Sequence, residues 1–152
     1  MSQQGRASLV VLDTETSGLA HFPWARVVEV GAVALAPDYA EIAAFSMLVR
    51  PDVLETRHIA ARKAWEVNGL DPAQVARVGV PERTAAKLFT LWHIALGEPP
   101  VTSWRVRFDR PMMERMGVQH LSWPWCLKQQ CGNLGLAKAC AKYDIQRGQA
   151  HR

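Results

Sequence analysis

The sequence predicts an α/β domain with one mixed sheet, whose first three strands are antiparallel, and helices on both faces of that sheet. Three apolar segments rich in β-branched residues, at residues 8–12, 27–35 and 41–49, are joined by short turns, which is typical of an antiparallel meander. Segments with helical spacing follow, and Val101–Ser103 has the composition of a further short strand. This order of elements favours a sheet with covered faces.

The first segment is expected to lie centrally in the sheet. Residues 8–12 (SLVVL) are apolar without alternation, which indicates a strand covered on both faces. A segment with glycine and proline connects this first strand to the strand at Val27–Leu35. A second segment, with proline, connects Val27–Leu35 to the strand at residues 41–49. Connections this short join antiparallel neighbours.

The middle of the chain predicts two helices. Residues 59–67 have helical spacing and are followed by Asn68-Gly69, a typical helix C-terminus. Asp71-Pro72 has the N-cap and first residue of a following helix.

The second half of the chain predicts three more helices. Residues 82–96 form a strongly apolar one, in which we expect His93 to be packed rather than catalytic. A second helix is expected to begin at Pro111. A last one should cover residues 134–143, with Asn133 as its cap.

Composition sets limits on the class of protein. The 152 residues fit one domain that can bury roughly 68–70% of its unfolded surface. A net charge of +4 and an isoelectric point of about 9.3 favour an anionic partner. The polar N-terminus and the lack of any run of about 18 apolar residues predict neither signal peptide nor membrane span, so we expect a cytoplasmic protein. The three cysteines match no zinc ribbon, and we expect reduced thiols.

Two carboxylates stand at the predicted end of the first strand, in Asp13-Thr14-Glu15. Residues i and i+2 of an extended chain point to the same side, so both carboxylates can reach one ion. Hard oxygen ligands suit Mg²⁺ or Mn²⁺. The same triplet also occurs as a solvated strand terminus, but the apolar strand before it and residues 16–19 (TSGL) after it favour a metal site.

These residues carry a resemblance to a known family. LDTETSGL (12–19), followed by ARVVEVGAVAL (25–35), resembles the first motif of the DEDD 3′–5′ exonucleases, which include proofreading subunits, ribonuclease T and oligoribonuclease. AWEVNGL (64–70) and Phe108-Asp109 in VRFDRPMMERMG resemble later elements of the family. Residues 134–145 and then Ala150-His151-Arg152 resemble the approach to the third motif of the histidine subtype. The resemblance spans residues 8–152 and implies an RNase H-like fold.

The resemblance also implies catalytic roles. Asp13, Glu15 and Asp109 would be the ligands of a two-metal site for Mg²⁺ or Mn²⁺, and His151 would be the general base. A phosphodiester repels hydroxide and its leaving 3′-oxygen needs charge stabilisation, which two ions about 4 Å apart can supply. A histidine with a pKa near neutrality can take the proton of the attacking water.

Substrate contacts are expected from Thr14, Trp65, Asn68 and Arg105. The resemblance implies that the backbone at Thr14 and Glu15 meets the terminal nucleotide and that Trp65 lies in the segment lining its pocket. Trp65 could stack on a base, although core packing is the alternative. Asn68 stands where the family has a histidine and keeps the capacity for hydrogen bonds. Arg105 could contact phosphate or face solvent without a ligand.

The sequence departs from the family in two places. Trp104-Arg105 stand where histidine and asparagine usually precede the second motif. The family's third motif has an aspartate five residues after its histidine, whereas this sequence ends one residue after His151. We therefore expect a single exonuclease-like domain over residues 1–152 that stops before the last catalytic helix. Either the sequence is a piece of a longer protein, which we favour, or the natural protein lacks this aspartate.

A group of basic residues flanks the second motif. Arg105, Arg107 and Arg110 surround Asp109 in the sequence. Such a group is usually a solvated face, but its position beside a predicted metal ligand favours contact with nucleic acid.

Three functions remain open at this point. The first is a metal-dependent 3′–5′ exonuclease that releases nucleoside 5′-monophosphates from single-stranded DNA or RNA, alone, with a polymerase or inside a larger protein. The second is a catalytically inactive nucleic-acid-binding or scaffold domain on the same fold, which Trp104-Arg105 and the absent aspartate favour. The third is an RNase H-like endonuclease or transferase, which the Asp-x-Glu triplet and His151 argue against. The retained carboxylates and His151 favour the first.

Overall fold

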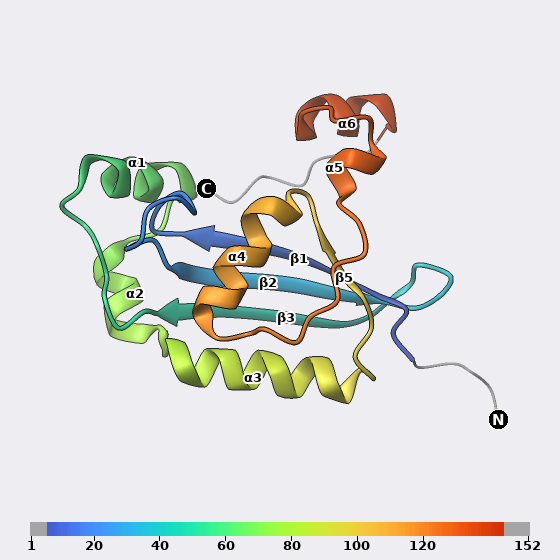
Figure 1. Cartoon of the computed structure of the whole chain (residues 1–152), viewed down its shortest axis with the longest axis horizontal. Coiled ribbons are helices and arrows are strands. Elements are labelled where there is room, and N and C mark those ends of the chain that lie inside the picture. The colour runs from blue at the N-terminus through green and yellow to red at the C-terminus, as the bar shows by residue number, and fades with distance from the viewer. Residues whose placement is uncertain (1–5, 145–152) are drawn as a thin grey trace.

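The computed structural model describes residues 6–144, which form a five-stranded mixed sheet with helices on its two faces (Figure 1). The strands are β1 (Leu9–Thr16), β2 (Val27–Leu35), β3 (Glu41–Arg50), β4 (Val80–Pro81) and β5 (Val101–Ser103). The helices are α1 (Ile59–Asn68), α2 (Pro72–Val78), α3 (Glu82–Ala95), α4 (Val106–Met116), α5 (Leu127–Gln130) and α6 (Leu136–Lys142). The sheet order is β4-β3-β2-β1-β5.

Strands β1, β2 and β3 form the antiparallel meander that the sequence predicts, and β5 adds to β1 in parallel. On β1, Val10 and Leu12 are fully buried while Leu9 and Val11 are half-buried, so the strand is covered more on one face than on the other. The strand also continues through Thr16, well past the expected end at residue 12. It does so because residues 13–16 keep pairing with β2.

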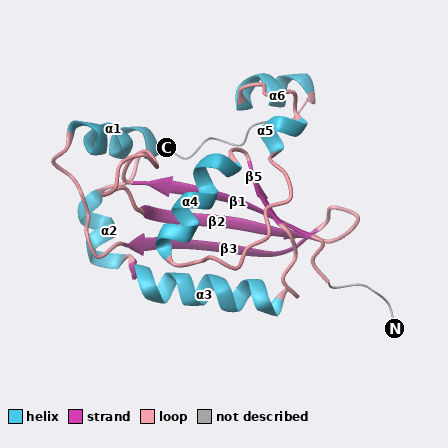
Figure 2. Ribbon diagram, viewed as in Figure 1, coloured by secondary structure: helices cyan, strands magenta, loops and turns pink. Residues whose placement is uncertain are grey.

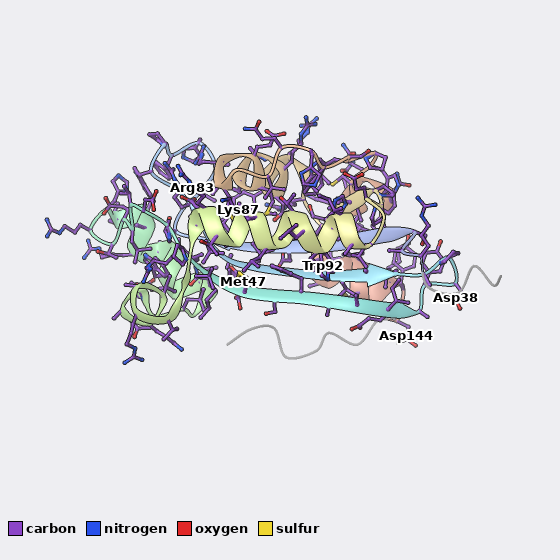
Figure 3. The ribbon with its side chains drawn as sticks, turned by 90° about the horizontal axis from the view of Figure 1, so that it is seen from below. Asp38, Met47, Arg83, Lys87, Trp92 and Asp144 are labelled. Carbon is purple, nitrogen blue, oxygen red and sulfur yellow. The ribbon has the colours of Figure 1, made fainter. Side chains whose placement is uncertain are left out.

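The two faces of the sheet are covered by different helices. On one face, α3 and α4 pack Phe89 and Met112 against residues of β1 and β2. In Figure 3, Met47 of β3 and Trp92 of α3 lie where this helix meets the sheet, and both pack against the same core. On the other face, α1 and α2 form a smaller cluster with Leu48, the neighbour of Met47 along β3. Successive strand residues point to opposite faces, so this second face is covered near Leu48, whereas Ile42, Ala44 and Ser46 further back along β3 are exposed.

Several helix predictions agree with the structure. α1 ends at Gly69, which adopts a left-handed conformation with φ 69°, and its N–H donates to the carbonyl of Trp65. The Asp71 side chain caps α2, accepting from the backbone N–H of Ala73, with Pro72 as the first helical residue. His93 is buried in α3, as expected.

Two helix boundaries differ from expectation. α4 begins at Val106 instead of Pro111, because the Arg105 carbonyl accepts from the N–H groups of Phe108 and Asp109 and closes a turn ahead of the proline. Asp109 therefore lies in the first turn of a helix. α6 is shorter than residues 134–143, and Asn133 does not cap it, since the N-cap is Gly135.

In Figure 2, α1 stands near one end of β1, α5 and α6 stand beyond β5, and α4 crosses between them. Within residues 6–144 the helices are too short or too polar for any of them to span a bilayer.

Candidate functional site

Asp109 is the most deeply buried carboxylate of the site predicted from the sequence. It is 3% exposed, and its Oδ1 accepts a hydrogen bond of 2.7 Å from Thr14 Oγ1. β5 stops at Ser103, which pairs with Leu12, so among the described residues β1 has no strand partner on this edge beyond Leu12. The first turn of α4 brings Asp109 to that open edge.

The charge state of Asp109 is governed by its surroundings. Burial raises the pKa of its carboxyl above the ordinary value, and the negative charge of Asp13 raises it further. The Thr14 hydroxyl, which donates to this carboxylate, the Thr14 backbone and the Ser103 hydroxyl oppose this rise in pKa. Asp13 and Asp109 thus act on each other electrostatically although they are far apart in the sequence.

Asp13 and Glu15 lie inside β1 rather than after its end. Asp13 is exposed and Glu15 half-buried, while Thr14 and Thr16 between and after them are buried. The two carboxylates therefore share one face of the strand, as the i and i+2 spacing predicts, and Thr14 points to the face from which Asp109 approaches. Within residues 6–144, no three His, Cys, Asp or Glu side chains are close enough together to hold a metal ion. Convergence of Asp13, Glu15 and Asp109 on one ion stays a prediction.

A cavity of about 300 Å³ opens beside these strand residues, and we call it the apolar cavity. Its walls come from β1, from the loop after it, from α1 and from Phe108 of α4. The lining residues are Thr14, Glu15, Thr16, Gly18, Leu19, Ala60, Lys63, Ala64, Val67, Asn68 and Phe108. Most of the exposed lining is apolar, which suits a flat ring system more than a charged group.

Two residues expected to contact substrate have structural contacts here. Asn68 Nδ2 donates to the Thr16 carbonyl at 3.2 Å and its Oδ1 accepts from the Leu70 N–H at 3.0 Å, so this side chain ties the end of α1 to β1. Trp65 is 6% exposed, packs in the cluster under α1, donates from Nε1 to the Glu55 carbonyl, and does not line the cavity. Trp65 takes the core-packing role that was the alternative to base stacking.

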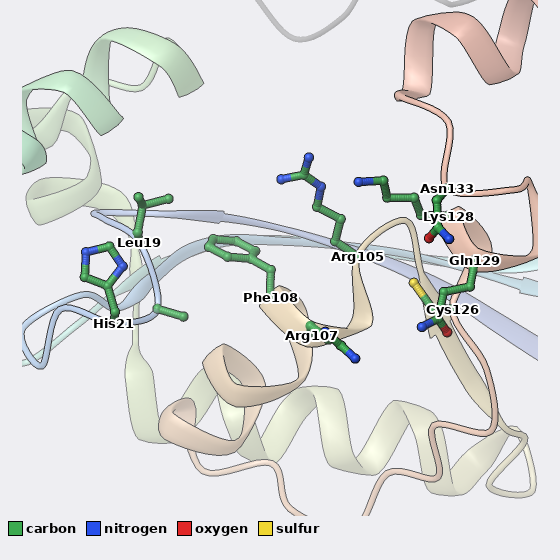
Figure 4. A pocket seen from close by; sticks show the side chains of 10 residues that line it. Leu19, His21, Arg105, Arg107, Phe108, Cys126, Lys128, Gln129 and Asn133 are labelled. Carbon is green, nitrogen blue, oxygen red and sulfur yellow. The ribbon is translucent and has the colours of Figure 1, made fainter.

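A second cavity, of about 580 Å³, lies on the other side of Phe108, and we call it the basic cavity (Figure 4). It is lined by Leu19, Ala20, His21, Arg105, Arg107, Phe108, Cys126, Lys128, Gln129 and Asn133. The two cavities share Leu19 and Phe108 as a common wall. Among residues 6–144 no carboxylate lines the basic cavity, whereas Arg105, a predicted substrate residue, does.

The thiol of Cys126 is unusual among the three cysteines, all of which are free as expected. Burial acts to raise its pKa, but the backbone N–H groups of Val106, Gln129 and Lys128 outweigh burial and lower the pKa below the ordinary value. The Lys128 charge acts in the same direction.

Sequence reasoning missed the shared wall and Lys128. Leu19 and Phe108 adjoin the two motifs, and that adjacency was the available signal. No sequence motif adjoins Lys128, because tertiary contacts bring this residue to the site. His151 lies outside the described residues, so its role as general base stays a prediction.

No protein-family model matches this chain, and no curated protein matches it. Solved structures do. Escherichia coli exonuclease I in complex with a dT13 oligonucleotide has 18% identity and a TM-score of 0.63, over 90% of this chain and 30% of that one. The zinc-bound form of the E. coli exonuclease I–ssDNA complex has 19% identity, a TM-score of 0.63 and the same coverage of 90% and 30%. Exonuclease I from Methylocaldum szegediense has 18% identity and a TM-score of 0.64, over 95% and 38%.

At these identities the likeness shows the fold. The mixed sheet with its helices is the RNase H-like fold of exonuclease I, which confirms the predicted fold class. The chain spans 30% to 38% of the length of these three structures.

Proposed function

We propose that the chain is the catalytic domain of a metal-dependent 3′–5′ exonuclease that hydrolyses single-stranded DNA to nucleoside 5′-monophosphates. The observation that carries the proposal is the buried Asp109 carboxylate, held by Thr14 at the edge of β1 within the electrostatic reach of Asp13. A buried acid beside a second acid costs stability, and such an arrangement is typical of functional sites. A bound cation would offset that cost.

The donor chemistry of the residues at this edge suits a divalent cation. Asp13, Glu15 and Asp109 supply hard oxygen ligands of the kind that Mg²⁺ and Mn²⁺ prefer. The buried Ser103 Oγ, whose hydroxyl lowers the pKa of Asp109, has no hydrogen-bond partner within residues 6–144. When bound, the metal would activate water and stabilise the leaving 3′-oxygen. In this proposal His151 takes the proton of the attacking water.

The apolar cavity is the proposed site of the 3′-terminal nucleotide. Leu19, Ala64 and Phe108 offer apolar surface to a base, and the cavity also contacts Thr14 and Glu15 of β1. A base bound there would place its 5′-phosphate toward the carboxylates. Single-stranded DNA is favoured over RNA because the exonuclease I structures with this fold contain a dT13 oligonucleotide or ssDNA. A polymerase or a larger protein as partner stays a prediction.

The test is cleavage of a 5′-labelled oligodeoxythymidine resolved on a denaturing gel. It uses the 152-residue chain and, where the coding sequence continues past codon 152, the longer product. We expect a ladder that shortens from the 3′ end in Mg²⁺ or Mn²⁺, stops with EDTA, and is absent for Asp13→Ala. Glu41→Gln, at the exposed start of β3, is the matched control and should cleave like the wild type. Internal cuts, or cleavage without metal, would contradict the exonuclease proposal.

The inactive nucleic-acid-binding domain is the second candidate. It is favoured by the basic cavity, which needs no metal to bind an anionic strand, and by Arg105 standing where the exonuclease family has asparagine. Binding of the oligonucleotide without cleavage by the longest available product, in either metal, would favour this alternative.

A further inference from the structure

We propose that the basic cavity is a phosphate-binding subsite, in which Arg105 and Lys128 clamp the backbone of single-stranded DNA on the 5′ side of the terminal nucleotide. The clamp itself requires no catalysis. The direction in which the strand runs rests on the proposed function, because that function places the 3′-terminal nucleotide in the apolar cavity.

Tertiary hydrogen bonds hold together the two chain segments that carry Arg105 and Lys128. The Lys128 N–H donates to the Trp104 carbonyl at 3.2 Å, one residue before Arg105, and Cys126 Sγ contacts the same carbonyl at 3.3 Å. Thr102 Oγ1 donates to the Trp125 carbonyl at 3.0 Å, which holds this segment along β5. In Figure 4 the Arg105 side chain extends upward and the Lys128 side chain extends to the left, both between Phe108 and Asn133.

The charges in the basic cavity are not neutralised within the described part of the chain. Among residues 6–144, none of the ion pairs involves Arg105, Arg107 or Lys128. Arg110, one turn further along α4, differs because its Nε lies 2.8 Å from Glu114 Oε1. Cations held close together without a carboxylate favour an anionic ligand.

The other polar residues of the cavity suit phosphate oxygens. Gln129 and Asn133 offer neutral amide donors beside the cations. An arginine guanidinium can bind a phosphate through two parallel hydrogen bonds, and a lysine binds it as a point charge. These groups bind the charged backbone and contact no base, so binding at the subsite should be independent of the DNA sequence.

The shared wall connects the subsite to the apolar cavity. Leu19 and Phe108 line both cavities, so a strand with its last base in the apolar cavity can pass over this wall into the basic one. The phosphates next to that base would then meet Arg105 and Lys128. A mononucleotide would not reach them.

The experiment measures binding in EDTA, so that no cleavage occurs. Fluorescence anisotropy gives the affinity for an oligodeoxythymidine of about 12 nucleotides across a salt series, and calorimetry gives the affinity for dTMP. The variants are Arg105→Gln with Lys128→Gln, and as matched control Arg83→Gln with Lys87→Gln. The control pair is exposed on α3 (Figure 3), lines neither of the two cavities, and removes the same charge.

For the clamp variant we expect about a tenfold or larger loss of oligonucleotide affinity. Its slope of log K against log salt should fall in magnitude by about 1.4, or about 0.7 for each charge removed. Its dTMP affinity should be unchanged, and the control pair should lose about twofold or less. Equal oligonucleotide losses in both double variants would overturn the proposal, as would an equal loss of dTMP affinity, which would indicate a site for free phosphate or mononucleotide. Arg105→Lys with Lys128→Arg should retain binding, which guards against a folding defect.

Failure of this proposal is distinguishable from failure of the proposed function. Cleavage by the wild type together with normal binding by the clamp variant would leave the exonuclease proposal standing and remove the subsite. Loss of binding in the clamp variant, without cleavage by the 152-residue chain or the longer protein, would support the subsite and remove the exonuclease proposal.

Discussion

The two cavities on either side of Phe108 differ in whether their polar side chains are engaged within the protein. In the apolar cavity the polar side chains are engaged within the protein, since Asn68 bonds to Thr16 and Leu70 and Thr14 bonds to Asp109. In the basic cavity, Arg105 and Lys128 form no ion pair within residues 6–144. Ligand affinity in the apolar cavity should therefore depend on the volume of the ligand and little on salt. Ligand affinity in the basic cavity should depend on salt and little on the identity of the base.

The largest expected effect is at the carboxylate edge of the apolar cavity. Asp109→Asn should reduce cleavage by about 10³-fold or more, because it removes an anionic metal ligand worth several kcal/mol. The same variant should be more stable by on the order of 1 kcal/mol, because burial disfavours the charged carboxylate and Asn can still accept from Thr14. Single-turnover cleavage and thermal unfolding measure the two effects.

An Asp109→Asn protein that is both inactive and less stable would indicate a structural role for this carboxylate. Oligonucleotide affinity in EDTA should not fall, since Asp109 is not among the residues that line the basic cavity.

The shared wall gives the next largest effect. Phe108→Ala should weaken binding of dTMP and of the oligonucleotide alike, by about 1–3 kcal/mol if a base stacks on the ring. The salt dependence should stay unchanged, because no charge is altered. Phe108→Leu keeps the apolar bulk without the aromatic face, and intermediate binding by this variant would separate stacking from simple filling. Unchanged dTMP affinity in Phe108→Ala would show that the two cavities do not act as one site.

The same comparison shows what the sequence can and cannot predict. Strand β2, the C-terminal end of α1 and the N-cap of α2 follow from local patterns, and so does the shared face of Asp13 and Glu15. The continuation of β1 to Thr16 depends on pairing with β2, and the early start of α4 depends on a turn that closes before Pro111. Neither is encoded in composition.

The basic cavity shows the same limit more clearly. Arg105 stands out in the sequence because it adjoins a motif, whereas Lys128 reaches the cavity through a hydrogen bond to Trp104. The burial of Trp65 likewise results from the packing of α1 and not from its neighbours in the sequence. Residues brought together by tertiary contacts leave no local pattern to find.

A smaller effect tests the basic cavity chemically. Cys126 should react with iodoacetamide several-fold faster than Cys131 at neutral pH, because its lowered pKa increases the thiolate fraction while both are half-buried. The added group would occupy the basic cavity, so labelled protein should lose oligonucleotide affinity and keep dTMP affinity. Mass spectrometry after partial labelling gives the order of reaction, and faster reaction of Cys131 would contradict this view of the cavity.

The smallest effect concerns a titrating group outside both cavities. His93 Nε2 lies 2.8 Å from the Pro99 carbonyl and Nδ1 lies 3.2 Å from His120 Nε2, an arrangement that a neutral ring satisfies by donating to Pro99 and accepting from His120. Burial lowers the pKa of His93, Pro99 and Glu98 oppose the fall, and His120 adds to it.

Because the folded-state pKa of His93 lies below the unfolded value of about 6.5, the unfolded chain binds the proton first. The contribution of neutral, buried His93 to the free energy of unfolding is complete above that unfolded value and is lost as the pH falls below it. We expect the free energy of unfolding, measured with denaturant, to decline from about pH 7.5 to about pH 5, and His93→Gln should flatten that decline. His21→Gln, at an exposed residue lining the basic cavity, should keep the wild-type decline. A decline that His21→Gln removes and His93→Gln keeps would place the titrating group in the basic cavity instead of the core.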